Sequence, residues 1–86
     1  MTRLLPTVKL YARPDCHLCD EARRELEAIR SGGTPFILVE VDIDSDDALL
    51  RRHLERIPVI ELDGEEVSAL GLDEEALRAR LATVSG

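Results

Sequence analysis

The two cysteines of the chain, Cys16 and Cys19, have the spacing C-x-x-C. Two thiols at this spacing on the first turn of a helix can close a tight disulfide ring and open it again. The first N–H groups of a helix lack partners within the helix and carry partial positive charge, so they favour a thiolate over a thiol. We therefore predict that the N–H groups of Leu18 and Cys19 donate to the Cys16 sulfur and lower the pKa of the Cys16 thiol. Cys19, one turn inside the helix, is expected to be less exposed.

Charged residues around the cysteines act in opposite directions. Arg13 stabilises a thiolate if it lies close, whereas Asp15, Asp20 and Glu21 disfavour one. His17, between the two cysteines, can donate a hydrogen bond or, when protonated, stabilise the thiolate. A solvated loop position is an equally good interpretation of His17. The sequence therefore predicts that the pKa of the Cys16 thiol is lowered, but it predicts no value for that pKa.

Length and composition limit the class of protein. The 86 residues predict one domain over residues 1–86, with a modest core. A net charge of −7 without a basic stripe argues against nucleic acid and against an anionic membrane surface, and no apolar run approaches the roughly 18 residues of a membrane span. Met1 to Pro6 is too short for a signal peptide, so we expect a cytoplasmic protein. In that compartment paired cysteines are more often redox-active or metal-binding than structural.

Polarity patterns place the cysteines between a strand and a helix. Thr7 to Ala12 alternates in polarity, which predicts a strand that ends before Pro14. From Cys16 onward the apolar residues recur at helical spacing, and the glycines of the segment 31–35 end the helix. The buried stripe of this helix is predicted to consist of Leu18, Ala22, Leu26 and Ile29.

The middle of the chain predicts a second strand and an acidic turn. Phe36 to Ile43 is almost continuously apolar, which is typical of a strand covered on both faces. The acidic residues that follow lack the glycine and the terminal glutamate of a calcium loop, so an N-cap at Asp44 or Ser45 is the better interpretation. The next helix, Asp46 to Leu54, is expected to bury Leu50 and Leu54. His53 is interpreted as a partly solvated cation at the helix end, with a base that supports the site from behind, or a ligand, as the alternative.

The last third of the chain predicts a hairpin and a final helix. Strands Ile57 to Leu62 and Glu65 to Leu70 flank the turn signal Asp63-Gly64, and Asp73 caps the helix. Val67 and Ala69 are expected inward in the second strand. The stripe of the final helix is expected to be Leu77, Leu81 and Val84. The element order is thus β-α-β-α-β-β-α, with the first two strands parallel, and the fold class is α/β with a four-stranded mixed sheet and helices on both faces.

Two segments on these elements resemble glutaredoxin-like proteins of the thioredoxin superfamily. Y-A-R-P-D-C-H-L-C resembles the glutaredoxin active-site segment, and R-I-P-V-I-E-L-D-G-E-E-V resembles the segment in which the family places a cis-proline opposite the reactive cysteine. The resemblance covers nearly the whole chain and implies a thioredoxin-like, glutaredoxin-type fold. It also implies that Cys16 is the nucleophile and Cys19 the resolving cysteine.

The resemblance further implies how a substrate binds. Ile57–Pro58 would be a cis peptide bond, and the backbone of Ile57 would pair with an extended substrate. The implied substrate-binding residues are Arg13, His17, Leu18, Ile57 and Pro58. The chain departs from typical glutaredoxins where His17-Leu18 replaces Pro-Tyr, and where residues 68–73 replace the Gly-Gly and Asp that hold glutathione. Arg13 can still meet a carboxylate of glutathione, so glutathione stays a candidate reducing co-substrate. No other cofactor and no metal is expected.

Three functions remain open from the sequence. In the first, the C-x-x-C dithiol reduces a disulfide-containing protein or a small-thiol mixed disulfide, and glutathione or a reductase restores the dithiol. The second is a metal or iron–sulfur carrier that uses Cys16 with thiols of a partner, because the spacing of His17 between the cysteines is poor for a closed zinc site. The third is a non-catalytic thioredoxin-like interaction module. We favour the oxidoreductase and expect a monomer.

Overall fold

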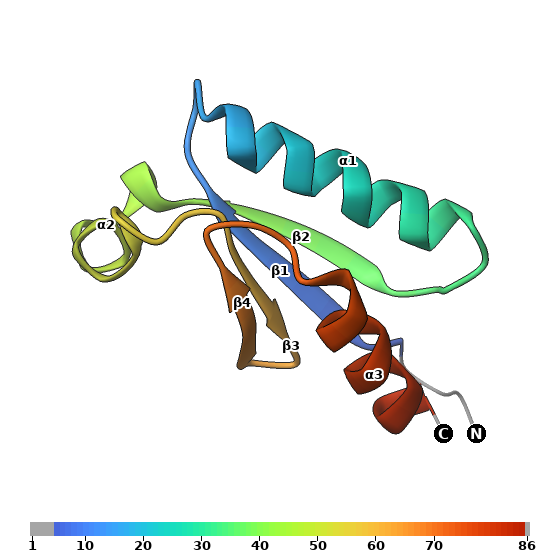
Figure 1. Cartoon of the computed structure of the whole chain (residues 1–86). Coiled ribbons are helices and arrows are strands. Elements are labelled where there is room, and N and C mark those ends of the chain that lie inside the picture. The colour runs from blue at the N-terminus through green and yellow to red at the C-terminus, as the bar shows by residue number, and fades with distance from the viewer. Residues whose placement is uncertain (1–4, 86) are drawn as a thin grey trace.

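The computed structural model describes residues 5–85 and has the predicted order of elements (Figure 1). They are β1 (Thr7–Ala12), α1 (His17–Ser31), β2 (Ile37–Asp42), the 3-10 turn η1 (Ile43–Ser45), α2 (Asp47–His53), β3 (Val59–Leu62), β4 (Glu65–Ala69) and α3 (Glu74–Ser85). Most of the segment on which the signal-peptide argument rests lies outside the described residues. Of the helices within residues 5–85, none has the length and apolarity to span a membrane.

The four strands form one mixed sheet in the order β2-β1-β3-β4. β1 and β2, which α1 connects, are parallel, whereas β1 with β3 and β3 with β4 are antiparallel. The predicted four-stranded mixed sheet is therefore confirmed. β1 lies in the interior of the sheet, and Val8 and Leu10 on it have no exposed surface. β1, which leads into the turn before the cysteines, is therefore hydrogen-bonded to a neighbouring strand on each side.

The sheet separates two hydrophobic clusters, so helices cover both of its faces. The larger cluster packs the sheet against α1 and α3, and the smaller one lies on the other face, beneath η1 and α2 (Figure 1). Members of the larger cluster include Leu10, Leu26, Ile60, Leu77 and Leu81. The smaller cluster consists of Tyr11, Ile43 and Val59, with Leu49 and Leu50 packed against it. The predicted two-sided α/β arrangement is confirmed.

The predicted hairpin is also confirmed. Asp63 and Gly64 have positive φ angles of 49° and 89°, the backbone that a two-residue turn between twisted strands requires. The register of β3 and β4 shifts in mid-strand. Because one residue on the longer strand is then unopposed, Val67 and Ala69 pack against different clusters instead of sharing one inward face.

The prediction that Phe36 to Ile43 is covered on both faces is wrong. β2 is an edge strand, and its Ile37 and Val39 side chains are 46% and 37% exposed. Val41 on the same face packs against the smaller cluster. α2 has only seven residues, or about 10 Å of helix, so it covers one end of this face and leaves the other open.

α2 turns a different side toward the sheet than predicted. His53 is only 2% exposed and its ring lies 4.5 Å from that of Tyr11, whereas Leu54 is 43% exposed. The predictions of a solvated His53 and a buried Leu54 are therefore wrong. Leu49 and Leu50 precede His53 by four and three residues, so the three side chains share one helix face, and the imidazole points inward with the leucines.

The N-cap of α2 lies later in the chain than predicted. Asp46 caps the helix through Oδ1, which accepts a hydrogen bond from the Ala48 N–H at 2.8 Å. Asp44 and Ser45 belong to η1 instead, so their assignment as the cap is wrong. Several acidic and hydroxyl residues in a row can each cap a turn, and the chain uses the first of them, Asp42, for η1 and a later one for α2.

α3 begins at the predicted cap, but its buried stripe is shorter than predicted. The Asp73 carboxylate accepts a hydrogen bond from the Ala76 N–H at 3.0 Å, which is the expected cap. Leu77 and Leu81 are buried, whereas Val84 is 49% exposed, so its assignment to the buried stripe is wrong. In Figure 1 the last turn of α3 lies past the end of the sheet, in agreement with the exposure of Val84.

Candidate active site

Cys16 is the N-cap of α1, so its sulfur lies at the start of the helix. Its backbone is extended, with φ −104° and ψ 107°, and the Cys19 N–H donates to the Cys16 Sγ at 3.2 Å. The Asp20 N–H donates to the Cys16 carbonyl at 3.1 Å. Of the two amide donors predicted for the sulfur, the structure has that of Cys19. The two cysteines form a disulfide with their Cα atoms 5.2 Å apart.

The two sulfurs differ in exposure in the predicted sense. Cys19 has no exposed surface, whereas Cys16 is half-buried at the margin of the larger cluster. Cys19 therefore occupies the inward position on the first turn of α1, and the assignment of Leu18 to that position is wrong. Leu18 is 50% exposed. Both residues fit helical spacing with Ala22, and the smaller side chain takes the place against the sheet.

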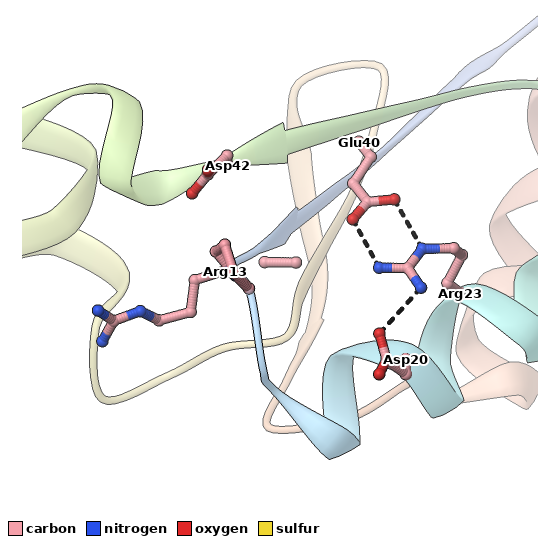
Figure 2. Close-up of a pocket in the computed structure, with 7 residues that line it drawn as sticks. Arg13, Asp20, Arg23, Glu40 and Asp42 are labelled. Atoms are coloured by element: carbon pink, nitrogen blue, oxygen red, sulfur yellow. Dashed lines mark hydrogen bonds and ion pairs between the residues drawn. The ribbon is translucent and has the colours of Figure 1, made fainter.

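Arg13 and His17 lie near the cysteines in the chain and pair with acidic groups. The Arg13 guanidinium lies 3.4 Å from the Asp44 carboxylate, and in Figure 2 it extends away from α1. The His17 Nε2 lies 3.2 Å from Glu21 Oε1, and the His17 side chain is 80% exposed. Among the hydrogen bonds and ion pairs of residues 5–85, neither side chain has the Cys16 sulfur as a partner. Their roles toward a substrate stay predictions.

The Ile57–Pro58 peptide bond is cis, as the resemblance implied. Pro58 is fully buried, and Ile57 is half-buried and packs against both hydrophobic clusters. Cys16 packs against the larger of the same two clusters. A substrate at this segment would therefore meet the backbone rather than the proline ring.

Strand register brings three segments to one end of the sheet. Tyr11, near the end of β1, pairs with Val59 at the start of β3, and Val59 pairs with Ala69 at the end of β4. The active-site turn after β1, the cis-proline segment before β3 and the loop after β4 consequently meet at the same end. The sequence predicted the first two as site segments, and the strand pairing adds the third.

A pocket of about 340 Å³ lies between the active-site turn, α1 and β2. Arg23 of α1 crosses it: its Nε and Nη2 each donate to the Glu40 carboxylate at 2.7 Å, and its Nη1 donates to Asp20 Oδ1 at 2.9 Å (Figure 2). These carboxylates, Glu40 more than Asp20, raise the pKa of Arg23. The network ties the first turns of α1 to the edge strand. Sequence reasoning missed it, because only the Asp20–Arg23 spacing is a local signal.

His53 is a second ionisable group that sequence reasoning misplaced. Neither nitrogen of its ring has a hydrogen-bond partner among residues 5–85. Burial is the main cause that lowers the pKa of His53, and the charges of Arg52 and Arg56 lower it further. Glu61 and Glu66 act in the opposite direction. The net effect of burial and these charges favours the neutral form of the imidazole.

The arrangement at the start of α1 is suited to disulfide exchange. Cys16 is half-buried and its sulfur accepts a backbone hydrogen bond, whereas Cys19, which is bonded to it, is fully buried. Within residues 5–85, no group of three His, Cys, Asp or Glu side chains is placed to hold a metal ion.

Solved structures with the same arrangement define the class. The chain superposes on a protein from Nitrosomonas europaea with a TM-score of 0.80 and 26% identity, over 93% of this chain and 95% of that one. A protein from X. campestris gives 0.67 and 38% identity, over 88% of this chain and 96% of that one. The oxidised thioredoxin from Plasmodium falciparum gives 0.62 at 16% identity, over 96% of this chain and 84% of that one. The fold is thioredoxin-like.

Sequence similarity defines a narrower class than the fold does. Residues 7–82 match the family described as glutaredoxin-like domain (DUF836). An uncharacterised protein of Mycobacterium tuberculosis is 32% identical over 81 residues, which cover 90% of this chain and 84% of that protein. The chain belongs to the glutaredoxin-like domain family. Membership, the thioredoxin-like fold and the C-x-x-C motif together support a redox-type role.

Proposed function

We propose that this protein is a thiol–disulfide oxidoreductase in which Cys16 and Cys19 exchange two electrons with a substrate disulfide. The observation that carries the proposal is the 3.2 Å hydrogen bond from the Cys19 N–H to the Cys16 Sγ at the N-cap of α1. In the reduced protein the same N–H group and the start of the helix favour a thiolate at Cys16. A thiolate, and not a thiol, attacks a disulfide.

The reaction proceeds by two exchanges. The Cys16 thiolate attacks one sulfur of the substrate disulfide, so a bond forms between Cys16 and that sulfur while the substrate S–S bond breaks and the first substrate thiolate leaves. Cys19, after losing its proton to solvent, attacks the Cys16 sulfur and expels the second substrate thiolate. The substrate gains two electrons and takes up two protons, and the protein is left with the Cys16–Cys19 disulfide.

A reductant must return two electrons in every cycle. We propose glutathione, two molecules of which can open the disulfide in succession, or a disulfide reductase as that partner. A cytoplasmic location suits such a cycle, because that compartment keeps thiols reduced. The substrate is a disulfide-containing protein or a mixed disulfide of a small thiol, and the protein acts as a monomer.

Substrate binding is proposed at the residues around the disulfide. The backbone of Ile57 pairs with an extended substrate chain, since Pro58 beside it is fully buried and offers only its main chain. Leu18 contributes an exposed apolar side chain. Arg13 and His17, which pair with carboxylates of this chain, can exchange those partners for a carboxylate of the substrate.

The test is turnover of a small mixed disulfide with glutathione as reductant, and in parallel with dithiothreitol, for the wild type, Cys16→Ser and Cys19→Ser. We expect the wild type to turn over and Cys16→Ser to be inactive with both reductants. Cys19→Ser should keep activity with glutathione, because a second glutathione can resolve the intermediate. Cys19→Ser is the matched control, since it also removes the disulfide.

The outcomes separate the parts of the proposal. Activity of Cys16→Ser equal to that of the wild type would show that Cys16 is not the nucleophile. Turnover by the wild type with dithiothreitol alone would retain the oxidoreductase and remove glutathione as the donor. An inactive wild type with either reductant would overturn the proposed function.

A further inference from the structure

An acidic side chain lies one helical turn after the nucleophilic cysteine. The Asp20 N–H donates to the Cys16 carbonyl at 3.1 Å, so Asp20 follows Cys16 by one turn of α1, or about 5.4 Å. Side chains on a helix lean toward its N-terminus and lie beside those of the preceding turn. A free Asp20 carboxylate would therefore lean toward the Cys16 sulfur, where its negative charge opposes a thiolate.

The Asp20 carboxylate is paired with a cation that comes from further along the helix. Arg23 Nη1 donates to Asp20 Oδ1 at 2.9 Å, and Arg23 lies three residues after Asp20 on α1 (Figure 2). The hydrogen bond that the Cys16 sulfur accepts comes from the Cys19 N–H. The backbone donor and the acid next to it in the chain are thus directed to different partners.

Glu40 holds the Arg23 guanidinium in place. Its carboxylate, on the edge strand β2, accepts hydrogen bonds from Arg23 Nε and Nη2 at 2.7 Å each. Two parallel hydrogen bonds fix the plane of a guanidinium and leave its other nitrogen directed at a second acceptor, which the ammonium of a lysine cannot do. Because β2 is paired with β1 in the sheet, Asp20 is tied through Arg23 to a rigid element.

Stability alone is a weak reason for this cluster of charges. The side chains of Asp20, Arg23 and Glu40 are all partly exposed, and ion pairs at such positions contribute little to folding. Arg13, a second arginine beside the same pocket, pairs with Asp44 and extends away from α1 (Figure 2). Of the two arginines that line this pocket, Arg23 is therefore the one that meets Asp20.

We propose that Arg23 is a positioning residue for disulfide exchange: it keeps the Asp20 carboxylate directed away from the Cys16 sulfur and balances its charge, so that the start of α1 stabilises a thiolate without an opposing acid. This inference rests on the proposed function, because it concerns the thiol that the proposed function makes the nucleophile. Arg23 acts through Asp20 rather than on the sulfur itself. Removing Arg23 should therefore slow the reaction of Cys16 only while residue 20 is an acid.

The test is the rate at which iodoacetamide alkylates the fully reduced protein between about pH 5 and about pH 9, in about 0.15 M salt so that distant charges are screened. Iodoacetamide reacts with the thiolate, and peptide mass spectrometry quantifies the adduct at Cys16. We expect Arg23→Gln to react about threefold more slowly than the wild type at about pH 6, since the charge of one partly exposed partner changes an equilibrium by that order. Its pH profile should move to higher pH and reach the rate of the wild type once the thiol is fully ionised.

Two further variants separate the positioning role from a structural one. The double variant Asp20→Asn/Arg23→Gln lacks the same guanidinium, yet it should react at the rate of the wild type, because the opposing acid is gone. If Arg23 acted only by holding the first turns of α1 to the sheet, this double variant would be as slow as Arg23→Gln. Arg24→Gln is the matched control, because it removes the same charge from the exposed neighbouring position and should leave the pH profile unchanged.

An Arg23→Gln profile equal to that of the wild type, a double variant as slow as Arg23→Gln, or an equal shift in Arg24→Gln would each overturn the positioning role. Alkylation needs no disulfide, so these results do not depend on turnover. In parallel, each reduced protein is mixed with a symmetrical peptide disulfide, and the released thiol should show the same deficit for Arg23→Gln. A wild type whose Cys16 is alkylated but that releases no thiol would instead contradict the proposed function on which this inference rests.

Discussion

Replacing His53 with phenylalanine tests the buried imidazole. His53 is 2% exposed, and neither ring nitrogen has a partner among residues 5–85. Its ring contacts that of Tyr11 of β1, and the charges that act on its pKa are those of Arg52, Arg56, Glu61 and Glu66. The substitution His53→Phe keeps an aromatic ring against Tyr11 and removes the titration.

The sign of the pH effect follows from the lowered pKa of His53 in the folded protein. Above the pKa of about 6.5 that histidine has in an unfolded chain, neither state is protonated and His53 makes no pH-dependent contribution. As the pH falls below that value, the unfolded state binds a proton that the folded state does not, so stability is lost. One proton accounts for at most about 1.4 kcal/mol between pH 7.5 and pH 5.5.

The assay is urea denaturation of the oxidised protein at the two pH values, followed by far-ultraviolet circular dichroism. The difference between wild type and His53→Phe at pH 7.5 sums two opposing effects. Removing unpaired buried nitrogens gains about 1–3 kcal/mol, and fitting a larger ring costs a similar amount. Neither effect depends on pH, so both cancel when the stability difference between variant and wild type at pH 7.5 is subtracted from that at pH 5.5. We expect this subtraction to favour the variant by up to about 1.4 kcal/mol.

The reasoning is refuted if His53→Phe also loses as much as the wild type, since the folded protein would then protonate His53 as readily as the unfolded chain.

Two further predictions concern contacts outside the core. Glu40→Gln removes the paired hydrogen bonds to Arg23, and because both side chains are partly exposed the cost is less than about 1 kcal/mol, or a few degrees in Tm. Glu27→Gln, at an exposed position on α1, should leave Tm unchanged, and equal Tm values for these two variants would contradict the assignment. Asp73→Ala removes the cap of α3 and should lower Tm by about 4–8 °C, for a loss of about 1 kcal/mol. Asp73→Ser should restore most of this, and a serine variant no better than the alanine variant would show that capping is not the cause.

The order of elements and the position of the disulfide could be predicted because their signals are local. Alternation marks β1, the Asp63-Gly64 pair marks the hairpin, and the C-x-x-C motif at a strand-to-helix junction marks the site. The cis bond at Ile57–Pro58 had no local signal, and came instead from resemblance to the family.

What the sequence could not predict depends on how elements cover one another. Apolar residues in β2 predict burial, but the length of α2 and its place over the sheet leave Ile37 and Val39 open. In the same way, helical spacing allows either His53 or Leu54 to face inward, and the long-range contact with Tyr11 is made by His53.

The missed parts of the site are long-range for the same reason. Arg23 and Glu40 are 17 residues apart and meet only because β2 lies beside the strand that precedes α1. Ala69, at the end of β4, lies 53 residues after Cys16 and reaches the same end of the sheet through two successive strand pairings. No periodicity within one element contains that information.

Trapping the covalent intermediate tests the central claim most directly. Reduced Cys19→Ser and reduced Cys16→Ser are each mixed with a peptide disulfide, quenched with acid and weighed by mass spectrometry under non-reducing conditions. We predict that Cys19→Ser accumulates one peptide adduct at Cys16, because the thiol that would release it is absent, and that Cys16→Ser forms almost none, because Cys19 is fully buried. Adduct formation in Cys16→Ser as fast as in Cys19→Ser, or no adduct in Cys19→Ser, would contradict the assignment of Cys16 as the nucleophile.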